Sequence, residues 1–95
     1  MKHPNGIEFD WHEQNTEHLA AHKVTPAEFE QVMNNDPLDL GFDAIEGEER
    51  YRSVGITNAG RLLLVVWIVR NGKIRAVTAF RASASNKRDY LESRR

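Results

Sequence analysis

Arginine and histidine side chains give this sequence its clearest capacity for chemistry on a phosphate group. Four arginines, Arg50, Arg52, Arg75 and Arg81, lie on or beside segments whose pattern predicts strands. A guanidinium group can donate two parallel hydrogen bonds to phosphate oxygens, so these side chains could bracket a phosphodiester. The alternative is that exposed sheet faces simply carry arginines whose aliphatic stems cover apolar surface.

The alternation of side chains along a strand predicts which arginines share a face. Arg75 and Arg81 fall on the same side of the strand expected over residues 73–80. Arg50 and Arg52 fall on the same side of a neighbouring strand that begins at Arg50. We therefore expect two pairs of arginines on sheet faces.

A helix expected over about residues 11–22 has polar groups on the face that should meet the core. The residues that recur there at helical spacing are Trp11, Asn15, His18, Leu19 and His22. Three interpretations stay open. The two histidines could share a metal ion, although they lack a His-Glu-x-x-His pattern. The polar groups could hydrogen-bond to the sheet or to loop carbonyls. His22 could act as an acid–base group or contact phosphate.

The charges of this sequence are divided between its two halves. Residues 1–49 carry twelve acidic and two basic side chains, whereas residues 50–95 carry eleven basic and two acidic ones. The basic half could meet a nucleic acid or an acidic protein. Alternatively, the two halves could neutralise each other within the folded domain.

The composition excludes several classes of protein. There is no cysteine, so disulfides, thiol catalysis and cysteine-based zinc sites are excluded, and a cytoplasmic location is expected. Residues 1–6 contain no apolar signal-peptide core, and the longest apolar run, residues 62–69, is too short to span a bilayer. The length predicts a single domain over residues 1–95.

Turn and cap signals predict where the elements begin and end. Asp10, with Glu13 three residues on, resembles a capping box, and Thr25-Pro26 with Glu28 is a stronger helix start. Asn71-Gly72 predicts a tight hairpin. The predicted order is two helices, a meander of three or four antiparallel strands, with an acidic loop over residues 43–49, and a last helix capped by Ser83. This order is typical of the α+β class.

Taken together, these segments resemble the BrnT family over about residues 7–92. The resemblance is carried by a set of short motifs and single residues in a fixed order: Phe9-Asp10-Trp11, Asn15, His22 and Val24, Asn35-Asp36-Pro37, Gly47-Glu48-Glu49-Arg50, Gly55, and Thr78-Ala79 ahead of the helix with Tyr90. Within this set, Ala21-His22-Lys23 stands where the family commonly has Lys-His-Gly.

The resemblance implies a compact fold similar to RelE-type ribonucleases and a role as the toxin of a bacterial type II toxin–antitoxin pair. Such a toxin cuts RNA, blocks translation and binds a DNA-binding, BrnA-like antitoxin. Under this hypothesis His22, Arg50, Arg75 and Arg81 are catalytic. No metal or other cofactor is needed. The residues expected to contact RNA are Arg52, Lys87 and Arg88.

Two further positions depart from the family pattern. Phe80 stands where an arginine is common, and Asn86 stands where a glutamate is common. These departures favour an alternative in which the chain is a catalytically weak module that binds an antitoxin or RNA. A third interpretation is an interaction domain whose charged halves drive head-to-tail self-association, so a homo-oligomer stays open.

Overall fold

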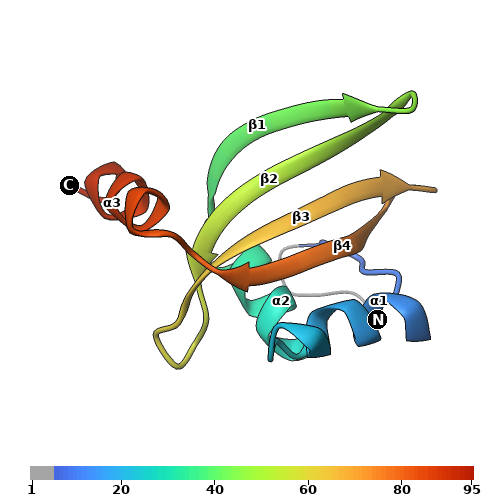
Figure 1. The fold of residues 1–95 in the computed structure, drawn as a ribbon, viewed down its shortest axis with the longest axis horizontal. Coiled ribbons are helices and arrows are strands. Elements are labelled where there is room, and N and C mark those ends of the chain that lie inside the picture. The colour runs from blue at the N-terminus through green and yellow to red at the C-terminus, as the bar shows by residue number, and fades with distance from the viewer. Residues whose placement is uncertain (1–5) are drawn as a thin grey trace.

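The computed structural model describes residues 6–95 and places a four-stranded antiparallel sheet between two N-terminal helices and a C-terminal one (Figure 1). The elements are α1 (Glu13–Ala21), α2 (Pro26–Asn34), β1 (Leu38–Ile45), β2 (Glu48–Ile56), β3 (Leu62–Arg70), β4 (Lys73–Arg81) and α3 (Ala84–Ser93). This confirms the predicted α+β class. Most of the N-terminal segment judged to lack a signal-peptide core lies outside the described residues. Within residues 6–95, no helix is long and apolar enough to cross a membrane.

The helices begin where the strongest cap signals predict. The Thr25 side chain accepts a hydrogen bond from the backbone N–H of Glu28, and the Glu28 carboxylate accepts one from the N–H of Thr25. The Ser83 side chain caps α3 through the N–H of Asn86. The cap predicted at Asp10 is wrong, because α1 starts after His12 without a side-chain cap.

The strands follow one another in the order β1-β2-β3-β4, each antiparallel to the next. Asn71 and Gly72 turn the chain with φ of 54° and 76°, as predicted. The acidic loop predicted over residues 43–49 is wrong, since only Glu46 and Gly47 form a turn between β1 and β2. Their φ values are 51° and 79°, a conformation that Glu rarely adopts, so this second hairpin had no clear sequence signal.

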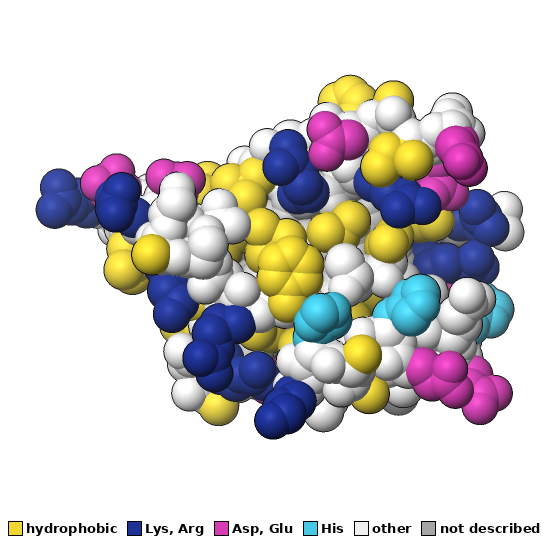
Figure 2. Space-filling model, viewed as in Figure 1, with side chains coloured by type: hydrophobic (Ala, Val, Ile, Leu, Met, Phe, Trp, Pro, Cys, Tyr) yellow, Lys and Arg dark blue, Asp and Glu magenta, His cyan; other side chains and the backbone are white. Residues whose placement is uncertain are grey.

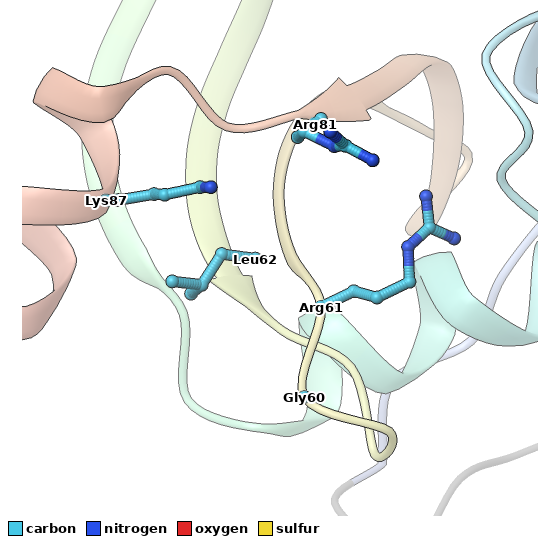
Figure 3. A pocket seen from close by; sticks show the side chains of 5 residues that line it. All are labelled: Gly60, Arg61, Leu62, Arg81 and Lys87. Atoms are coloured by element: carbon cyan, nitrogen blue, oxygen red, sulfur yellow. The ribbon is translucent and has the colours of Figure 1, made fainter.

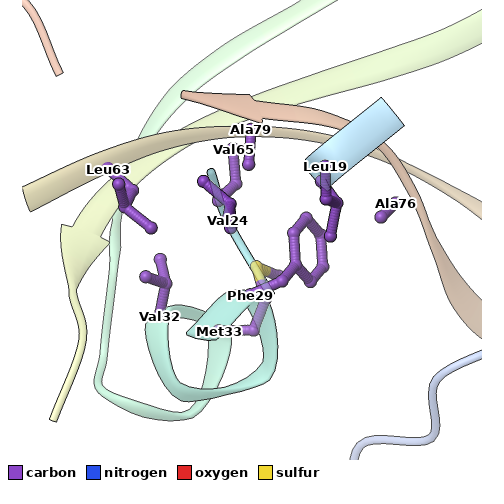
Figure 4. Close-up of a cluster of buried hydrophobic side chains, with 9 residues drawn as sticks. All are labelled: Leu19, Val24, Phe29, Val32, Met33, Leu63, Val65, Ala76 and Ala79. Atoms are coloured by element: carbon purple, nitrogen blue, oxygen red, sulfur yellow. The ribbon is translucent and has the colours of Figure 1, made fainter. Parts of the chain in front are cut away.

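The two faces of the sheet are covered unequally. We call the face that α1 and α2 cover the helical face; its core includes Phe29, Leu19, Leu63 and Val65, all fully buried (Figure 4). We call the opposite face the open face. There α3 packs through Tyr90 against a smaller cluster at one end of the sheet.

A bulge in β4 decides which arginines share a face. Val66 pairs with Thr78 and Trp67 with Ala76, so Val77 is an extra residue in the ladder. As a result Ala76 and Ala79, three residues apart, both enter the core of the helical face. Arg81 then lies on the helical face and Arg75 on the open face. The prediction that these two arginines share a face is wrong, because the bulge reverses the alternation.

The segment before α1 is fastened to β4. The N–H of Asp10 donates to the carbonyl of Ile74, and the N–H of Ile74 donates to the carbonyl of Glu8, both at 2.9 Å. The Arg75 guanidinium adds a 2.8 Å hydrogen bond to Oδ2 of Asp10, and Oδ1 lies 3.1 Å from Nε2 of His12. These contacts hold the chain ahead of α1 against the edge of the sheet.

A close approach between α2 and β2 requires a glycine. A Cβ added at Gly55 would lie 2.9 Å from Cγ1 of Val32 and 3.1 Å from Cβ of Pro37. We therefore expect Gly55→Ala to lower the free energy of unfolding by about 1–3 kcal/mol, the usual cost of overpacking a core. Urea unfolding followed by circular dichroism measures this change.

Val32→Ala tests whether the loss comes from this contact. The single change leaves a cavity, but in the double variant it makes room for the new Cβ. We expect the double variant to lose less stability than the two single variants together. Additive losses would contradict the steric explanation.

The carboxylate of Asp10 should make stability depend on pH. The hydrogen bond from Arg75, assisted by His12, holds the pKa of Asp10 below its ordinary value. A carboxylate with a lowered pKa stabilises the folded state above its unfolded pKa, near 3.9, and this contribution is lost as pH falls through the folded value. Asp10→Asn should therefore lower the urea midpoint at pH 7, and the deficit should shrink below about pH 4.

Asp89→Asn is the matched control for this titration, because the side chain of Asp89 is exposed and forms no ion pair or hydrogen bond within residues 6–95. We expect its urea midpoint to follow that of the parent chain at every pH. A deficit in Asp10→Asn that stays constant with pH would contradict the assigned role of Asp10.

Candidate active site

Ion pairs within the domain neutralise many of the arginines. Six arginines lie within 4 Å of a carboxylate, and every one of those carboxylates comes from the acidic half of the sequence. The pairs are Arg50–Glu48, Arg52–Asp43, Arg61–Glu28, Arg70–Glu48, Arg75–Asp10 and Arg94–Asp36. The alternative that the two halves neutralise each other is therefore correct for these side chains.

The remaining positive charge gathers at one end of the molecule. Six cations form no ion pair with any part of the chain that the structure describes: Lys23, Lys73, Arg81, Lys87, Arg88 and Arg95. Four of the six lie at the end of β4, in α3 or just after it. Figure 2 shows Lys and Arg side chains gathered where the end of β4 meets the start of β3. This end of the molecule is the best place for a phosphate.

A pocket of about 200 Å³ lies at this end, lined by Gly60, Arg61, Leu62, Arg81 and Lys87. Figure 3 shows the side chains of Arg61 and Arg81 pointing toward one another, while Lys87 extends from α3 toward the strand that carries Leu62. Cationic residues from three different segments therefore line one pocket, with Lys87 on the opposite side of the Leu62 strand from the guanidinium groups of Arg61 and Arg81 in Figure 3. Such a pocket suits an anion that can accept several charge-assisted hydrogen bonds.

Arg61 is held in place from the N-terminal end of α2. Its Nη1 donates to Oε2 of Glu28 at 2.7 Å and to the carbonyl of Lys23 at 3.1 Å. Burial raises the pKa of Glu28, but the N–H of Thr25 and then the Arg61 guanidinium outweigh burial and leave that pKa below its usual value. Glu28 is thus an anion that orients Arg61, and the other three nitrogen-bound protons of the Arg61 guanidinium stay available.

His22 lies near the same end of β4 as this pocket. Its ring packs against Phe80 with the ring centroids 5.7 Å apart. Phe80 directly precedes Arg81, and His22 directly precedes Lys23, whose carbonyl binds Arg61. The imidazole is therefore one residue away from Arg81 through Phe80, and one residue away from the carbonyl that binds Arg61. Because His22 is exposed, it can exchange protons with solvent or a bound ligand.

The four residues expected to be catalytic do not meet at one point. His22 and Arg81 lie at one end of β4, whereas Arg75 lies six residues earlier on the opposite face. Six residues of strand span about 20 Å. The register places Arg50 beside Ile68, the partner of Arg75, so these two arginines belong to the distant end. One phosphate therefore cannot contact all four side chains.

The residues expected to contact RNA are also divided. Lys87 lines the pocket of Arg61 and Arg81, and Arg88 lies on the neighbouring part of α3. Arg52 lies on the open face, where its Nε is 3.4 Å from Oδ2 of Asp43. That Nε is buried and forms no hydrogen bond within residues 6–95, so Arg52 is held by charge and packing.

The polar stripe of α1 has a structural part and an exposed part. Nδ2 of Asn15 donates to the carbonyl of Ala76 at 2.9 Å, which is the hydrogen bond to the sheet that one interpretation expected. His18 and His22 are exposed (Figure 2 shows histidines along the border of a hydrophobic surface). Within residues 6–95, no three His, Asp or Glu side chains come close enough to hold a metal ion.

Arg61 is the site residue that sequence reasoning missed. It directly follows the turn at Gly60 and precedes the apolar run of β3, a position that looks like a solvated turn end. Its role depends on Glu28, which lies 33 residues earlier in the chain. Only the packing of α2 against the sheet brings the two together, and no local pattern encodes that contact.

Comparison with known proteins supports one family. A search among curated proteins found no match. The family model described as "Ribonuclease toxin, BrnT, of type II toxin-antitoxin system" matches residues 11–86, which is most of the chain. The matched range covers α1, α2, the whole sheet and the start of α3. The chain therefore belongs to the BrnT family of ribonuclease toxins of type II toxin–antitoxin systems.

Proposed function

We propose that the pocket of Arg61, Arg81 and Lys87, with His22 near it, is where this toxin binds and cleaves RNA without a metal ion. One observation carries the proposal: Arg81 and Lys87 have no ion pair within the described residues, and they line one pocket together with Arg61. A ligand phosphate would supply the missing counter-charge. The sheet arginines at the far end already have theirs.

The chemistry available to these residues is an internal transfer of the phosphoryl group. The ribose 2′-oxygen attacks the adjacent phosphorus, the bond to the 5′-oxygen breaks, and a 2′,3′-cyclic phosphate and a 5′-hydroxyl result. His22 would take the proton from the 2′-hydroxyl or give one to the leaving oxygen. Arg81 and Lys87 would stabilise the charge that builds on the phosphorane oxygens. Arg61, oriented by Glu28, would fix the phosphate before reaction.

Membership of a type II system implies an antitoxin partner. We further propose that this partner is a DNA-binding, BrnA-like protein and that RNA cleavage by the free toxin blocks translation. Charge on the toxin supports RNA as the target, because four of the six cations without an ion pair in the described residues lie at the end of β4, in α3 or just after it.

One observation favours a binding module as the second candidate. The ring of Phe80 covers one side of His22, at a position where an arginine would otherwise supply a further positive charge. Without that charge, the site has one group fewer to stabilise a phosphorane. In that case the pocket would hold RNA without cutting it.

Substitutions at the two ends of β4 test the location of the site. We expect His22→Ala to lower the rate of RNA cleavage by about 10²–10⁴-fold and Arg81→Ala by about 10²–10³-fold. Lys73→Ala removes an equally unpaired cation from the opposite end of the same strand and should leave the rate unchanged. Cleavage of a fluorogenic RNA by purified protein measures all three rates.

The outcomes separate the two candidates. If the parent chain binds RNA but leaves it intact, and its induction does not stop bacterial growth, the binding module is correct. If Lys73→Ala slows cleavage as much as Arg81→Ala does, the site lies elsewhere.

Cleavage should not depend on a divalent cation. The pocket is lined by three cationic side chains, which repel a metal ion and offer no carboxylate to bind it. We expect the same cleavage rate in excess EDTA as in magnesium when ionic strength is held constant. Loss of activity in EDTA, restored by added magnesium, would contradict the proposed chemistry.

A further inference from the structure

Three aromatic rings form a row across β1, β2 and β3 on the helical face. Phe42 pairs with Tyr51, and Tyr51 pairs with Trp67, so the three side chains are aligned by the sheet register itself. The ring centroids are 5.5 Å apart for Phe42 and Tyr51 and 4.6 Å apart for Tyr51 and Trp67. We call this row the aromatic ladder.

The aromatic ladder runs from the core to the edge of the sheet. Trp67 packs against the core of the helical face, and its Nε1 donates to Oγ of Ser53 at 3.1 Å. At the other end Phe42 is 53% exposed on the edge strand β1. Val69, next to Trp67 on the same face, is 55% exposed. Figure 1 shows the β1–β2 hairpin extending beyond the helices, which leaves this part of the face uncovered.

The surroundings of the ladder are acidic. The hydroxyl of Tyr51 donates a 2.6 Å hydrogen bond to Oε2 of Glu49. That bond, with burial and the nearby charges of Glu49 and Asp39, raises the pKa of Tyr51. Glu49 forms no ion pair with any cation in the described part of the chain. It is therefore an acid beside exposed hydrophobic surface.

A pocket of about 340 Å³ lies between the aromatic ladder and Glu49. It is lined by Gly47, Glu48, Glu49, Tyr51 and Val69. Glu48 is already bound by Arg50 and Arg70, so Glu49 is the acid left for a ligand. A lysine or arginine fits this lining, because its aliphatic stem can lie along Val69 and the Tyr51 ring while its charge meets Glu49.

We propose that the aromatic ladder and this pocket dock a protein partner through a segment that places one lysine or arginine beside apolar side chains. For a type II toxin that partner is the antitoxin, so the inference rests on family membership and not on the proposed RNA site. Clusters of exposed aromatic residues commonly dominate the energy of such interfaces. RNA is disfavoured here, because its phosphates would approach the carboxylates of Glu49 and Asp39.

Paired substitutions on two parts of the surface test this docking site. Phe42→Asp places a charge on the ladder, and Leu91→Asp does the same on α3, where Leu91 is 59% exposed. Glu49→Lys reverses the pocket charge, and Glu92→Lys is its control on α3. The binding probe is the purified antitoxin of this type II pair, titrated into each folded variant by calorimetry.

We expect Phe42→Asp and Glu49→Lys each to weaken binding by about tenfold or more, and both α3 controls to bind like the parent chain. The proposal is overturned if the parent does not bind this antitoxin, if the two ladder variants bind as tightly as the parent, or if the α3 controls lose as much. It is also overturned if Phe42→Asp loses affinity for RNA instead, which would make the ladder a base-stacking surface.

RNA cleavage by the free variants keeps this inference separate from the proposed function. Phe42→Asp and Glu49→Lys should cleave RNA as the parent does but escape inhibition by the antitoxin. If the parent chain itself leaves RNA intact, the proposed function fails, while the calorimetric comparison still decides the docking site.

Discussion

The chain has to bury two alanines of β4, three residues apart, on the same face of the sheet. A regular strand cannot do this, because its side chains alternate. The extra residue at Val77 resolves the conflict and lets both Ala76 and Ala79 pack beneath the helices. The same bulge sends Arg75 to the open face and Arg81 to the helical face. Core packing therefore decides which arginine fastens the N-terminal segment and which reaches the pocket.

Charge has two different roles in this domain. Most of the sheet arginines bind carboxylates from the first half of the sequence. Two arginine pairs, Arg75 with Asp10 and Arg61 with Glu28, join segments that are distant along the chain. Arg81, Lys87, Arg88 and Arg95, around α3, have no such partners within residues 6–95. The division of charge along the sequence thus serves mainly to form ion pairs between the two halves of the chain. Only the cations without an ion pair are left to bind a ligand.

Local signals predicted most of the fold. The capping box at Thr25, the cap at Ser83 and the turn at Asn71-Gly72 depend on residues within a few positions of one another, and all are confirmed. The bulge, the hairpin at Glu46-Gly47 and the Asp10 contact were missed, since each depends on residues that pair only in the folded sheet. The sequence did predict His22 and Arg81 as site candidates. It did not predict that Arg75 lies far from them or that Arg61 belongs to the pocket, because both depend on contacts formed only in the folded sheet.

The aromatic ladder and the cationic pocket are also separated in the order of synthesis. The ladder and its acidic pocket are encoded between Phe42 and Val69. The cationic pocket needs Arg81 from the last strand and Lys87 from the helix after it. A ribosome making this chain therefore adds every residue of the ladder before it adds the last cation of the pocket. The surface proposed to bind the antitoxin is therefore synthesised before the surface proposed to bind RNA is complete.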